Sequence, residues 1–156
     1  MREIKFRAWD KSQNKMYQVR GINFDNEDLW LKINETQIMG ANLFEVELMQ
    51  YTGLKDKNGT EIYEGDIIED CEGKKKKVIW HNNGFKLQYK YKKSYQGEIY
   101  WSTNKDIELN GTSDKRWGVE VIGNIFENLE LLLQESILDQ IRRKDLFIHV
   151  PYHSFD

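Results

Sequence analysis

The sequence predicts an α+β protein that is mainly β, because three patterns recur along its 156 residues. Apolar and polar residues alternate with period two in several short runs, which is typical of half-buried strands. Asn-Gly pairs separate some of these runs, as in β-hairpins. Near the end of the chain, apolar residues recur at spacings of three and four, which indicates one amphipathic helix. We expect a β-rich N-terminal subdomain (residues 1–49), a small β-barrel with a central hairpin (residues 50–125), and a C-terminal helix and tail (residues 126–156).

The first 20 residues predict a strand, a turn over residues 10–14 and a return strand. Alternation in the first strand places Ile4, Phe6 and Ala8 on one face and Lys5, Arg7 and Trp9 on the other. Arg7 and Trp9 suggest a binding surface, but we favour the interpretation that both faces are covered. In this interpretation, the core covers one face of the hairpin, and another subdomain or subunit covers the other face.

Residues 21–49 are less regular. Phe44, Val46 and Leu48 alternate with polar or flexible neighbours, which predicts a strand leading into the central hairpin. Gly40-Ala41-Asn42 precedes that run and predicts a break, or a flexible join between the two subdomains.

Residues 50–70 are the stretch around which the chain is organised. Asn58 and Gly59 lie between two apolar runs and predict a type I′ turn, which needs a positive φ at both central residues. Gly65 and Asp66 then break the second run and predict a sharp corner. We interpret these four residues as structural turns.

From Gly65 onward, short strands alternate with tight turns at spacings of about 8 to 12 residues, which is typical of a sandwich or a barrel. A glycine at a strand entry followed by a hairpin predicts an SH3-like barrel, an analogy that concerns the fold alone. Residues 81–84 predict a second Asn-Gly turn, and Phe85, Leu87, Tyr89 and Tyr91 alternate after it. A helix follows over residues 126–141, and its apolar positions are Phe126, Leu129, Leu132, Leu133, Ile137, Leu138 and Ile141.

The composition limits the class of protein and the compartment in which it can work. Apolar residues make up 39% of the chain, which is enough for a packed core, and the net charge is −3. Cys71 is the only cysteine, which excludes an internal disulfide. No apolar run approaches the roughly 18 to 20 residues of a membrane helix, and the charged N-terminus lacks a signal-peptide core. We therefore expect a cytoplasmic protein without membrane contact.

A basic stretch is the strongest candidate binding surface. Residues 73–105 contain nine lysines and one glutamate, and Tyr89, Tyr91, Tyr95, Tyr100 and Trp101 are interleaved with the lysines. Lysines neutralise phosphates and aromatic rings stack on bases, so this combination suits single-stranded nucleic acid. The candidate contact residues are Lys86, Tyr89, Lys90, Tyr91, Lys92 and Lys93. In the alternative interpretation, the aromatic residues belong to the barrel core and the lysines form its solvated outer face.

Three other groups are weak candidates for chemistry. The acidic cluster Glu64, Asp66, Glu69, Asp70 and Glu72 lacks the spacing of a calcium loop, and we interpret it as a structural turn. His149 and His153 are separated by Pro151, which disfavours a helical pair of metal ligands. Cys71 has no CxxC partner, and no triad can be completed around it. We therefore predict no catalytic residues, no metal and no cofactor, and do not expect an enzyme.

Three segments carry a family resemblance: MREIKFRAWDKSQNKM, TGLKDKNGTEIYEGDII and VEVIGNIFENLELL. Together and in this order they resemble the YopX family of phage and prophage proteins, over residues 1 to about 133. One position departs from the family pattern: its last block usually reads Glu-Asn-Pro-Glu, whereas Leu129 replaces the proline here. The resemblance implies a small, mostly β protein of mobile-element origin, in a bacterial host, with no established biochemical activity.

The leading functional hypothesis is a non-enzymatic phage or prophage accessory protein that assembles with itself or with a phage or host protein. Its motivation is apolar surface that a small barrel cannot enclose, in the N-terminal half and in the C-terminal segment. We therefore expect a homo-oligomer. The alternative is a nucleic-acid-binding module that acts through the lysine- and aromatic-rich face around residues 74–93.

Overall fold

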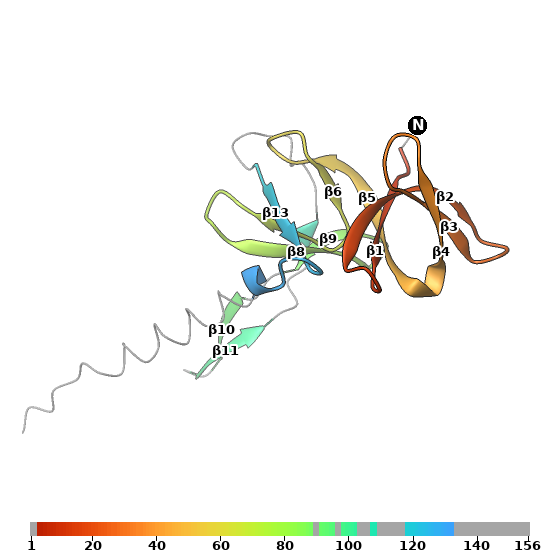
Figure 1. Ribbon diagram of the computed structural model, residues 1–156. Helices are drawn as coiled ribbons and strands as arrows, with labels where there is room; N and C mark the ends of the chain where they lie inside the picture. The colour runs from red at the N-terminus through yellow and green to blue at the C-terminus, as the bar shows by residue number, and fades with distance from the viewer. Residues whose placement is uncertain (1–2, 89–90, 96–97, 103–106, 109–117, 133–156) are drawn as a thin grey trace, which may run out of the picture.

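The computed structural model describes residues 3–88, 91–95, 98–102, 107–108 and 118–132 (Figure 1). Its elements are β1 (Phe6–Asp10), β2 (Lys15–Asn23), β3 (Asp28–Lys32), β4 (Ile38–Asn42), the 3-10 helix η1 (Leu43–Glu45), β5 (Val46–Lys55), β6 (Glu61–Tyr63), β7 (Asp66–Glu69), β8 (Lys75–His81), β9 (Gly84–Gln88), β10 (Tyr91–Tyr95), β11 (Glu98–Ser102), β12 (Ile107–Glu108) and β13 (Glu120–Asn124). The prediction of a mainly β protein is confirmed. The predicted start of the C-terminal helix was wrong, because residues 126–129 form a turn and a helical turn begins at Glu130. Residues 133–141 of the predicted helix lie outside the described residues.

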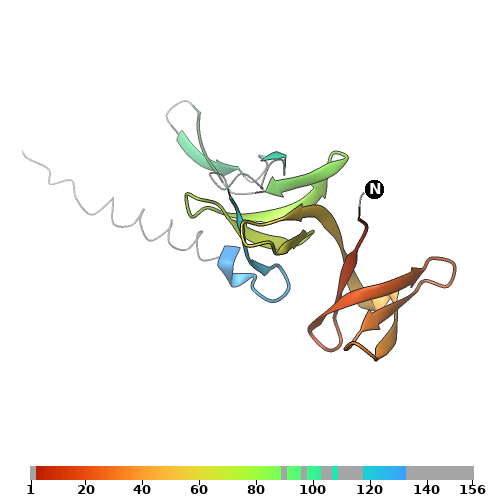
Figure 2. The same cartoon turned by 90° about the horizontal axis from the view of Figure 1, so that it is seen from above.

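The strands form three antiparallel sheets. A six-stranded sheet has the order β4-β3-β2-β1-β5-β6, a five-stranded sheet has the order β12-β9-β8-β7-β13, and β10 pairs with β11. Figure 2 shows the first four strands set apart from the five-stranded sheet, with β1 and β5 leading toward it. The pairings of the described strands close no barrel, so the SH3-like barrel stays a prediction.

Strand β1 is covered on both faces, as its alternation indicates. Ala8 is fully buried in the N-terminal core, where Tyr17, Leu29, Leu31 and Val46 surround it. On the other face, the Trp9 and Phe126 rings stack with their centroids 5.7 Å apart. The loop after β13 (Glu120–Asn124) therefore covers this face of β1 at Trp9.

Two predictions for residues 21–49 were wrong. Gly40-Ala41-Asn42 belongs to β4, and Phe44 lies in η1 instead of a strand. The cause is a capping box, which the alternating hydrophobic pattern does not reveal. The Asn42 side chain accepts a hydrogen bond from the Phe44 N–H, and the Glu45 carboxylate accepts one from the Asn42 N–H. Strand β5 (Val46–Lys55) then runs without a break across the predicted boundary at residues 49–50.

The turn type at Asn58-Gly59 was also predicted wrongly. Gly59 has a φ of 86°, but Asn58 does not have a positive φ. The Gly59 N–H donates to the Asp56 carbonyl, and the Asp56 N–H donates to the Thr60 carbonyl. This pattern is a type I turn followed by a glycine bulge, a three-residue loop. The Asp56 carboxylate stabilises the wider loop by accepting from the Asn58 and Thr60 N–H groups, both at 2.8 Å.

The second Asn-Gly pair has the type I′ geometry, one residue earlier than the dipeptide suggests. Asn82 and Asn83 have φ values of 48° and 64°, and His81 pairs with Gly84. Both central residues are therefore asparagines, the non-glycine residue that most readily adopts this conformation.

We expect Gly59→Val to lower the free energy of unfolding by about 1 to 3 kcal/mol. A Cβ at Gly59 meets no atom within 4 Å, so the cost is conformational and not steric. Urea denaturation measures the change. Asn58→Ala is the matched control, because residue 58 has no positive φ, and an equal loss in both variants would contradict the assigned turn.

The second core joins the five-stranded sheet to β6 of the six-stranded sheet. It consists of Ile62, Ile68, Val78, Leu87 and Val119, with Phe85 partly buried against it. Leu87 and Phe85 therefore have the core role that the alternation predicts. Strand β9 ends at Gln88 in this sheet, whereas β10 pairs with β11 in another. The predicted alternating run of residues 85–91 is thus divided between two sheets.

Candidate functional site

The three segments that carry the family resemblance meet at one place, where β1, the β6–β7 corner and the loop after β13 come together. Strand β1 contributes Arg7 and Trp9, the corner between β6 and β7 contributes Gly65 and Asp66, and the loop after β13 contributes Phe126. Strands β13 and β7 are directly paired, with Asn124 opposite Asp66. We call this region the junction.

A buried ion pair lies at its centre. The Arg7 Nη2 is 2.5 Å from the Asp66 Oδ1, and the two side chains are 12% and 1% exposed. The Asp66 Oδ2 accepts from the Tyr63 N–H at 2.7 Å, and the Arg7 guanidinium lies 4.8 Å from the centre of the Tyr63 ring. Burial raises the pKa of the Asp66 carboxyl, and the Arg7 guanidinium and the Tyr63 amide oppose that shift. Asp66 thus binds β1 to the corner and also closes the corner.

The pair is not fully satisfied, because the Arg7 Nε is buried without a hydrogen-bond partner among the described residues. An unpaired buried donor typically costs about 1 to 3 kcal/mol. The remaining contacts of the guanidinium with Asp66 and the Tyr63 ring must offset this cost.

Tyr63 extends the polar network toward the surface. Its hydroxyl donates to the Glu61 carboxylate at 2.8 Å, and the Lys5 Nζ lies 2.5 Å from the same carboxylate. Burial and the Glu61 acceptor raise the pKa of Tyr63 to about 12. The Tyr51 ring packs beside Tyr63 with centroids 5.4 Å apart. These contacts join β1, β5 and β6, and they supply no group poised for proton transfer near neutral pH.

Gly65 connects the corner to β8 and to the loop after β13. Its N–H donates to the Val78 carbonyl, and its carbonyl accepts from the Ile125 N–H, both at 2.9 Å. Its φ is 79°, and an added Cβ would lie 3.3 Å from the Met49 Sδ and 3.5 Å from Ile125. Glycine is therefore favoured here by backbone conformation and by space.

The loop after β13 is held by two asparagines. The Asn124 Oδ1 accepts from the Phe126 and Glu127 N–H groups, and the Asn128 Oδ1 accepts from the Asn124 N–H. The Asn128 N–H in turn donates to the Asn124 carbonyl at 2.9 Å. Leu129, which replaces the family's proline, follows this turn. The chain path is thus set before residue 129, with no need for a proline.

Asp56 links the central hairpin to β13. Its Oδ2 accepts from the Val121 N–H at 3.0 Å, and the neighbouring Lys57 N–H donates to the Val119 carbonyl. Burial raises the pKa of the Asp56 carboxyl, but the N–H donors of Val121, Thr60 and Asn58 lower it by more, so the pKa lies below its usual value. The ionised carboxylate is the form that stabilises the hairpin.

We expect the protein to lose stability in acid, partly through Asp56. Its pKa is lower in the folded chain than in the unfolded chain, so its contribution is present above about pH 4 and is lost as the pH falls through the folded value. Asp56→Asn should lower the free energy of unfolding at pH 7 by about 1.5 to 3 kcal/mol. Urea denaturation between pH 7 and pH 2 should show a shallower decline for the variant, and parallel curves would contradict this role.

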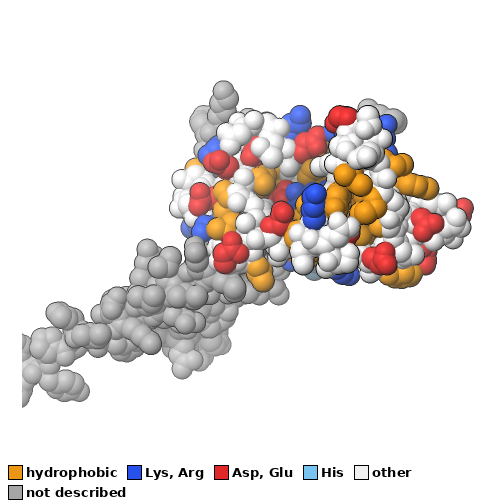
Figure 3. Space-filling model, viewed as in Figure 1, with side chains coloured by type: hydrophobic (Ala, Val, Ile, Leu, Met, Phe, Trp, Pro, Cys, Tyr) orange, Lys and Arg blue, Asp and Glu red, His pale blue; other side chains and the backbone are white. Residues whose placement is uncertain are grey.

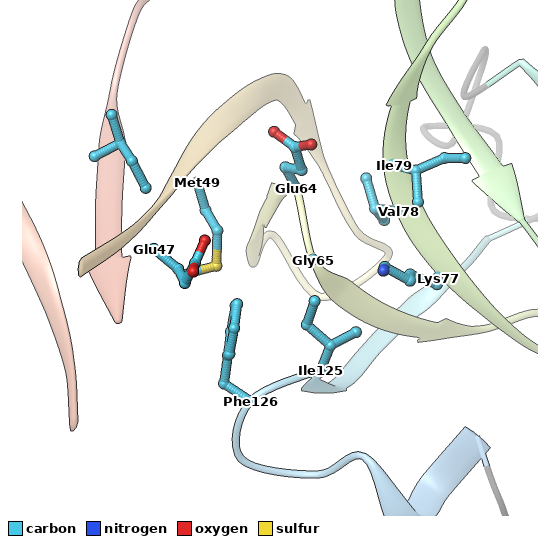
Figure 4. A pocket seen from close by; sticks show the side chains of 10 residues that line it. Glu47, Met49, Glu64, Gly65, Lys77, Val78, Ile79, Ile125 and Phe126 are labelled. Carbon is cyan, nitrogen blue, oxygen red and sulfur yellow. The ribbon is translucent and has the colours of Figure 1, made fainter. Parts of the chain in front are cut away.

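A small pocket of about 160 Å³ opens beside the junction. Figure 4 shows Met49, Ile125 and Phe126 gathered on one side of it, with Lys77 on another wall. Glu47, one of its lining residues, is ion-paired with Lys11 at 2.8 Å. The lining combines apolar side chains with charges of both signs, and it includes no Ser, Thr, Cys or His side chain.

The described residues contain no group of three or more His, Cys, Asp or Glu side chains that could hold a metal. Cys71 is an exposed free thiol, and His149 and His153 lie outside the described residues. Of the acidic cluster, Asp66 belongs to the junction, and Asp70 accepts from the Glu72 and Lys74 N–H groups in its turn. The predicted absence of catalysis, metal and cofactor stays a prediction.

The structure places the predicted nucleic-acid contacts on separate sheets. Lys86 lies in β9, whereas Tyr91, Lys92 and Lys93 lie in β10. Tyr89 and Lys90 lie outside the described residues.

Nearby lysines are paired with acidic residues. Lys74 contacts the Glu72 carboxylate, the Lys76 Nζ is 2.6 Å from the Asp70 Oδ2, and Lys75 stands opposite Glu69 on the neighbouring strand. At the start of β8, therefore, lysines of the lysine-rich stretch lie beside carboxylates.

Sequence reasoning missed the long-range partners of the junction. Arg7 and Asp66 are 59 positions apart, and Asp56 and Val121 are 65 apart. Asn124 and Asn128 were also missed, although an Asn three residues before a Glu is a signal for a side-chain cap.

Comparisons with known proteins identify a family and a similar solved structure. The family model described as YopX protein matches residues 5–133. The chain is similar to a solved structure described as the crystal structure of protein EF1440 from Enterococcus faecalis, with 28% sequence identity and a TM-score of 0.51. That match covers 85% of this chain and 99% of the other. No curated protein matches the chain. No helix among the described residues is long and apolar enough to cross a membrane.

Proposed function

This chain belongs to the YopX family, and we propose that it is a non-enzymatic phage or prophage accessory protein that assembles with itself through its N-terminal half, in the bacterial cytoplasm. The junction supports a structural role for the family's sequence blocks, because its charged groups pair with one another. We infer that function resides in a surface that contacts other protein chains.

The distribution of exposed apolar side chains carries this proposal. Eight large hydrophobic side chains are exposed among the described residues, and five of them lie within 21 consecutive positions of β3, β4 and the connections and 3-10 helix beside them: Phe24, Trp30, Ile33, Ile38 and Phe44. Figure 3 shows hydrophobic side chains gathered on that part of the molecule. Large apolar patches on a folded domain typically mark contacts with other proteins.

Light scattering tests the proposal. We expect a mass that is a multiple of 18.7 kDa at micromolar concentration. A mass near 18.7 kDa at every concentration would contradict self-assembly. If an oligomer forms, deleting residues 134–156 tells which part of the chain holds it. The oligomer should persist if the N-terminal half holds it, and should dissociate if the C-terminal segment holds it.

Nucleic-acid binding is the second candidate, favoured by the exposure of Trp80. Its side chain is 50% exposed at the end of the lysine-rich β8, and its ring meets the Phe85 ring edge-on at 4.9 Å. An exposed ring beside lysines suits base stacking. The pairing of Lys74 and Lys76 with acidic residues weakens this candidate relative to protein contact.

A salt series of gel shifts with single-stranded DNA tests the second candidate. We expect weak binding that falls as salt rises and that Lys90→Glu, Lys92→Glu and Lys93→Glu together abolish. No binding at low salt, or binding that ignores salt, would contradict it.

A further inference from the structure

Strand β4 is an open edge of the six-stranded sheet, because only β3 pairs with it among the described strands. Exposed edges pair readily with other chains, and proteins commonly protect them with charged residues, proline or a bulge. Strand β4 reads Ile-Met-Gly-Ala-Asn and has none of these protections. Its edge is therefore competent to accept another strand.

The ladder with β3 fixes which backbone groups of β4 are available. At its two ends, the Leu43 N–H donates to the Glu27 carbonyl and the Ile33 N–H donates to the Gln37 carbonyl. Hydrogen-bonded pairs alternate along an antiparallel ladder, so residues 39 and 41 also bond to β3. The N–H and C=O groups of Ile38 and Gly40 consequently point away from β3, toward the open edge.

The available stretch ends at Ile38 and Gly40. Beyond Gly40, the outward N–H of Asn42 is occupied by the Glu45 carboxylate at 3.3 Å. Before Ile38, the Thr36 N–H donates to the Asn34 side chain at 3.0 Å. An added strand therefore finds two donors and two acceptors, on residues two positions apart.

The face of β4 that carries Ile38 and Gly40 has unfilled space over Gly40, into which a side chain of an added strand can fit. Trp30 is opposite Gly40 and packs across Gly21, where an added Cβ would lie 3.3 Å from its ring. Above Gly40, an added Cβ would meet nothing within 4 Å. Ile38 lies on the same face, two positions from Gly40, and is 56% exposed. One strand thus carries both an exposed apolar side chain and a vacant position beside a tryptophan.

We propose that β4 pairs antiparallel with β4 of a second copy of this chain, about a two-fold axis at Met39. In this register, Ile38 of each copy is opposite Gly40 of the other. The four available backbone groups of each copy then form four hydrogen bonds. Each Ile38 side chain covers the vacant position over the opposing Gly40, beside that copy's Trp30. Because β4 contains no charged residue, the two-fold axis brings no like charges together within the paired strands.

Other registers use the edge less well. Centring the pair on Gly40 would require the Asn42 N–H, which Glu45 already occupies, and it would place the two vacant positions opposite each other. Centring it on Ile38 would require the Thr36 N–H, which Asn34 occupies. Only the register centred on Met39 satisfies the backbone groups and fills the space over Gly40.

This inference rests on the proposed self-assembly and names its interface. Disulfide trapping tests the register in a Cys71→Ser background, which removes the exposed native thiol. Hydrogen-bonded antiparallel partners have Cα atoms about 5.5 Å apart, within the range that a disulfide spans. We expect a mixture of Ile38→Cys and Gly40→Cys chains to form disulfide-linked dimers under mild oxidation. Each variant alone should not, and efficient linkage of Gly40→Cys with itself would overturn the register.

Edge-blocking variants test the interface without a cross-link. Gly40→Pro removes an outward N–H that β3 does not use, and Ile38→Lys removes the apolar side chain and adds charge. We expect each to raise the dissociation constant by at least about tenfold while far-UV circular dichroism is retained. Ile4→Lys is the matched control, because Ile4 is 68% exposed but precedes β1 and is not among the five exposed side chains that carry the self-assembly proposal. The dissociation constant of this variant should not change.

Different outcomes separate the two proposals. A wild-type chain that is monomeric at every concentration overturns self-assembly and this interface together. An oligomer that forms no mixed disulfide and ignores both edge-blocking variants overturns the β4 interface and leaves self-assembly standing. If another protein adds a strand to β4, that protein should bind the wild-type chain but not the edge-blocking variants, and the wild-type chain should form no homodimer. That result would also overturn a second copy as the occupant of the edge.

Discussion

Asp66→Ala is expected to lower the free energy of unfolding by about 3 to 5 kcal/mol, the range found when one partner of a buried ion pair is removed. The substitution leaves the Arg7 guanidinium, only 12% exposed, without its carboxylate, and it also removes the acceptor of the Tyr63 N–H. Since a domain of this size is stable by roughly 5 to 15 kcal/mol, a large fraction of the variant should be unfolded at moderate urea concentration. Urea denaturation followed by tryptophan fluorescence measures the loss.

Two controls distinguish a buried charge from a generic loss of contacts. Glu47→Ala breaks an ion pair with Lys11 in which both side chains are about half exposed, and it should change stability by less than about 1 kcal/mol. Combining Arg7→Met with Asp66→Leu removes both charges, so the double variant should be more stable than either Arg7→Met or Asp66→Ala. Equal losses from Glu47→Ala and Asp66→Ala would contradict the central place of the ion pair.

The parts of the fold that could be predicted are those encoded by neighbouring residues. Alternation around Ala8 gave the strand and both of its covered faces, because side-chain direction in a strand repeats every two residues. Phe85 and Leu87 follow the same rule in the second core. The prediction failed at Phe44, where the Asn42 and Glu45 side chains cap a 3-10 helix in a segment whose hydrophobic pattern alone fits a strand.

The junction could be predicted only in pieces. Gly65 and Asp66 were expected to form a corner, and the Asp66 carboxylate does accept from a backbone N–H there. Nothing local shows that its second oxygen contacts Arg7, because that contact depends on how two sheets pack. The same reason hid the bond from Val121 to Asp56, whose hairpin was expected to close by itself with a type I′ turn.

The residues of the junction indicate what the three sequence blocks of the family specify. Each of the three blocks supplies residues to the junction, and their charged and polar groups are mostly used in holding strands together. Strand β4, by contrast, lies between the first and second blocks. We infer that the blocks specify the shared fold, and that the exposed face of the N-terminal sheet is where contacts with other chains are made.

Gly123→Ala is expected to lower the free energy of unfolding by about 2 to 5 kcal/mol, because overpacking and lost hydrogen bonds act at one place. A Cβ at Gly123 would lie 2.5 Å from the Asn128 Oδ1 and 2.9 Å from its Cβ, so the Asn128 side chain must leave. The Asn124 N–H then loses its acceptor, and the loop carrying Ile125 and Phe126 shifts from Gly65 and Trp9. Gly84→Ala is the matched control, since its nearest contact is an ordinary 3.9 Å. Thermal unfolding of the two variants side by side decides the matter: equal melting temperatures would mean that Asn128 does not hold this loop.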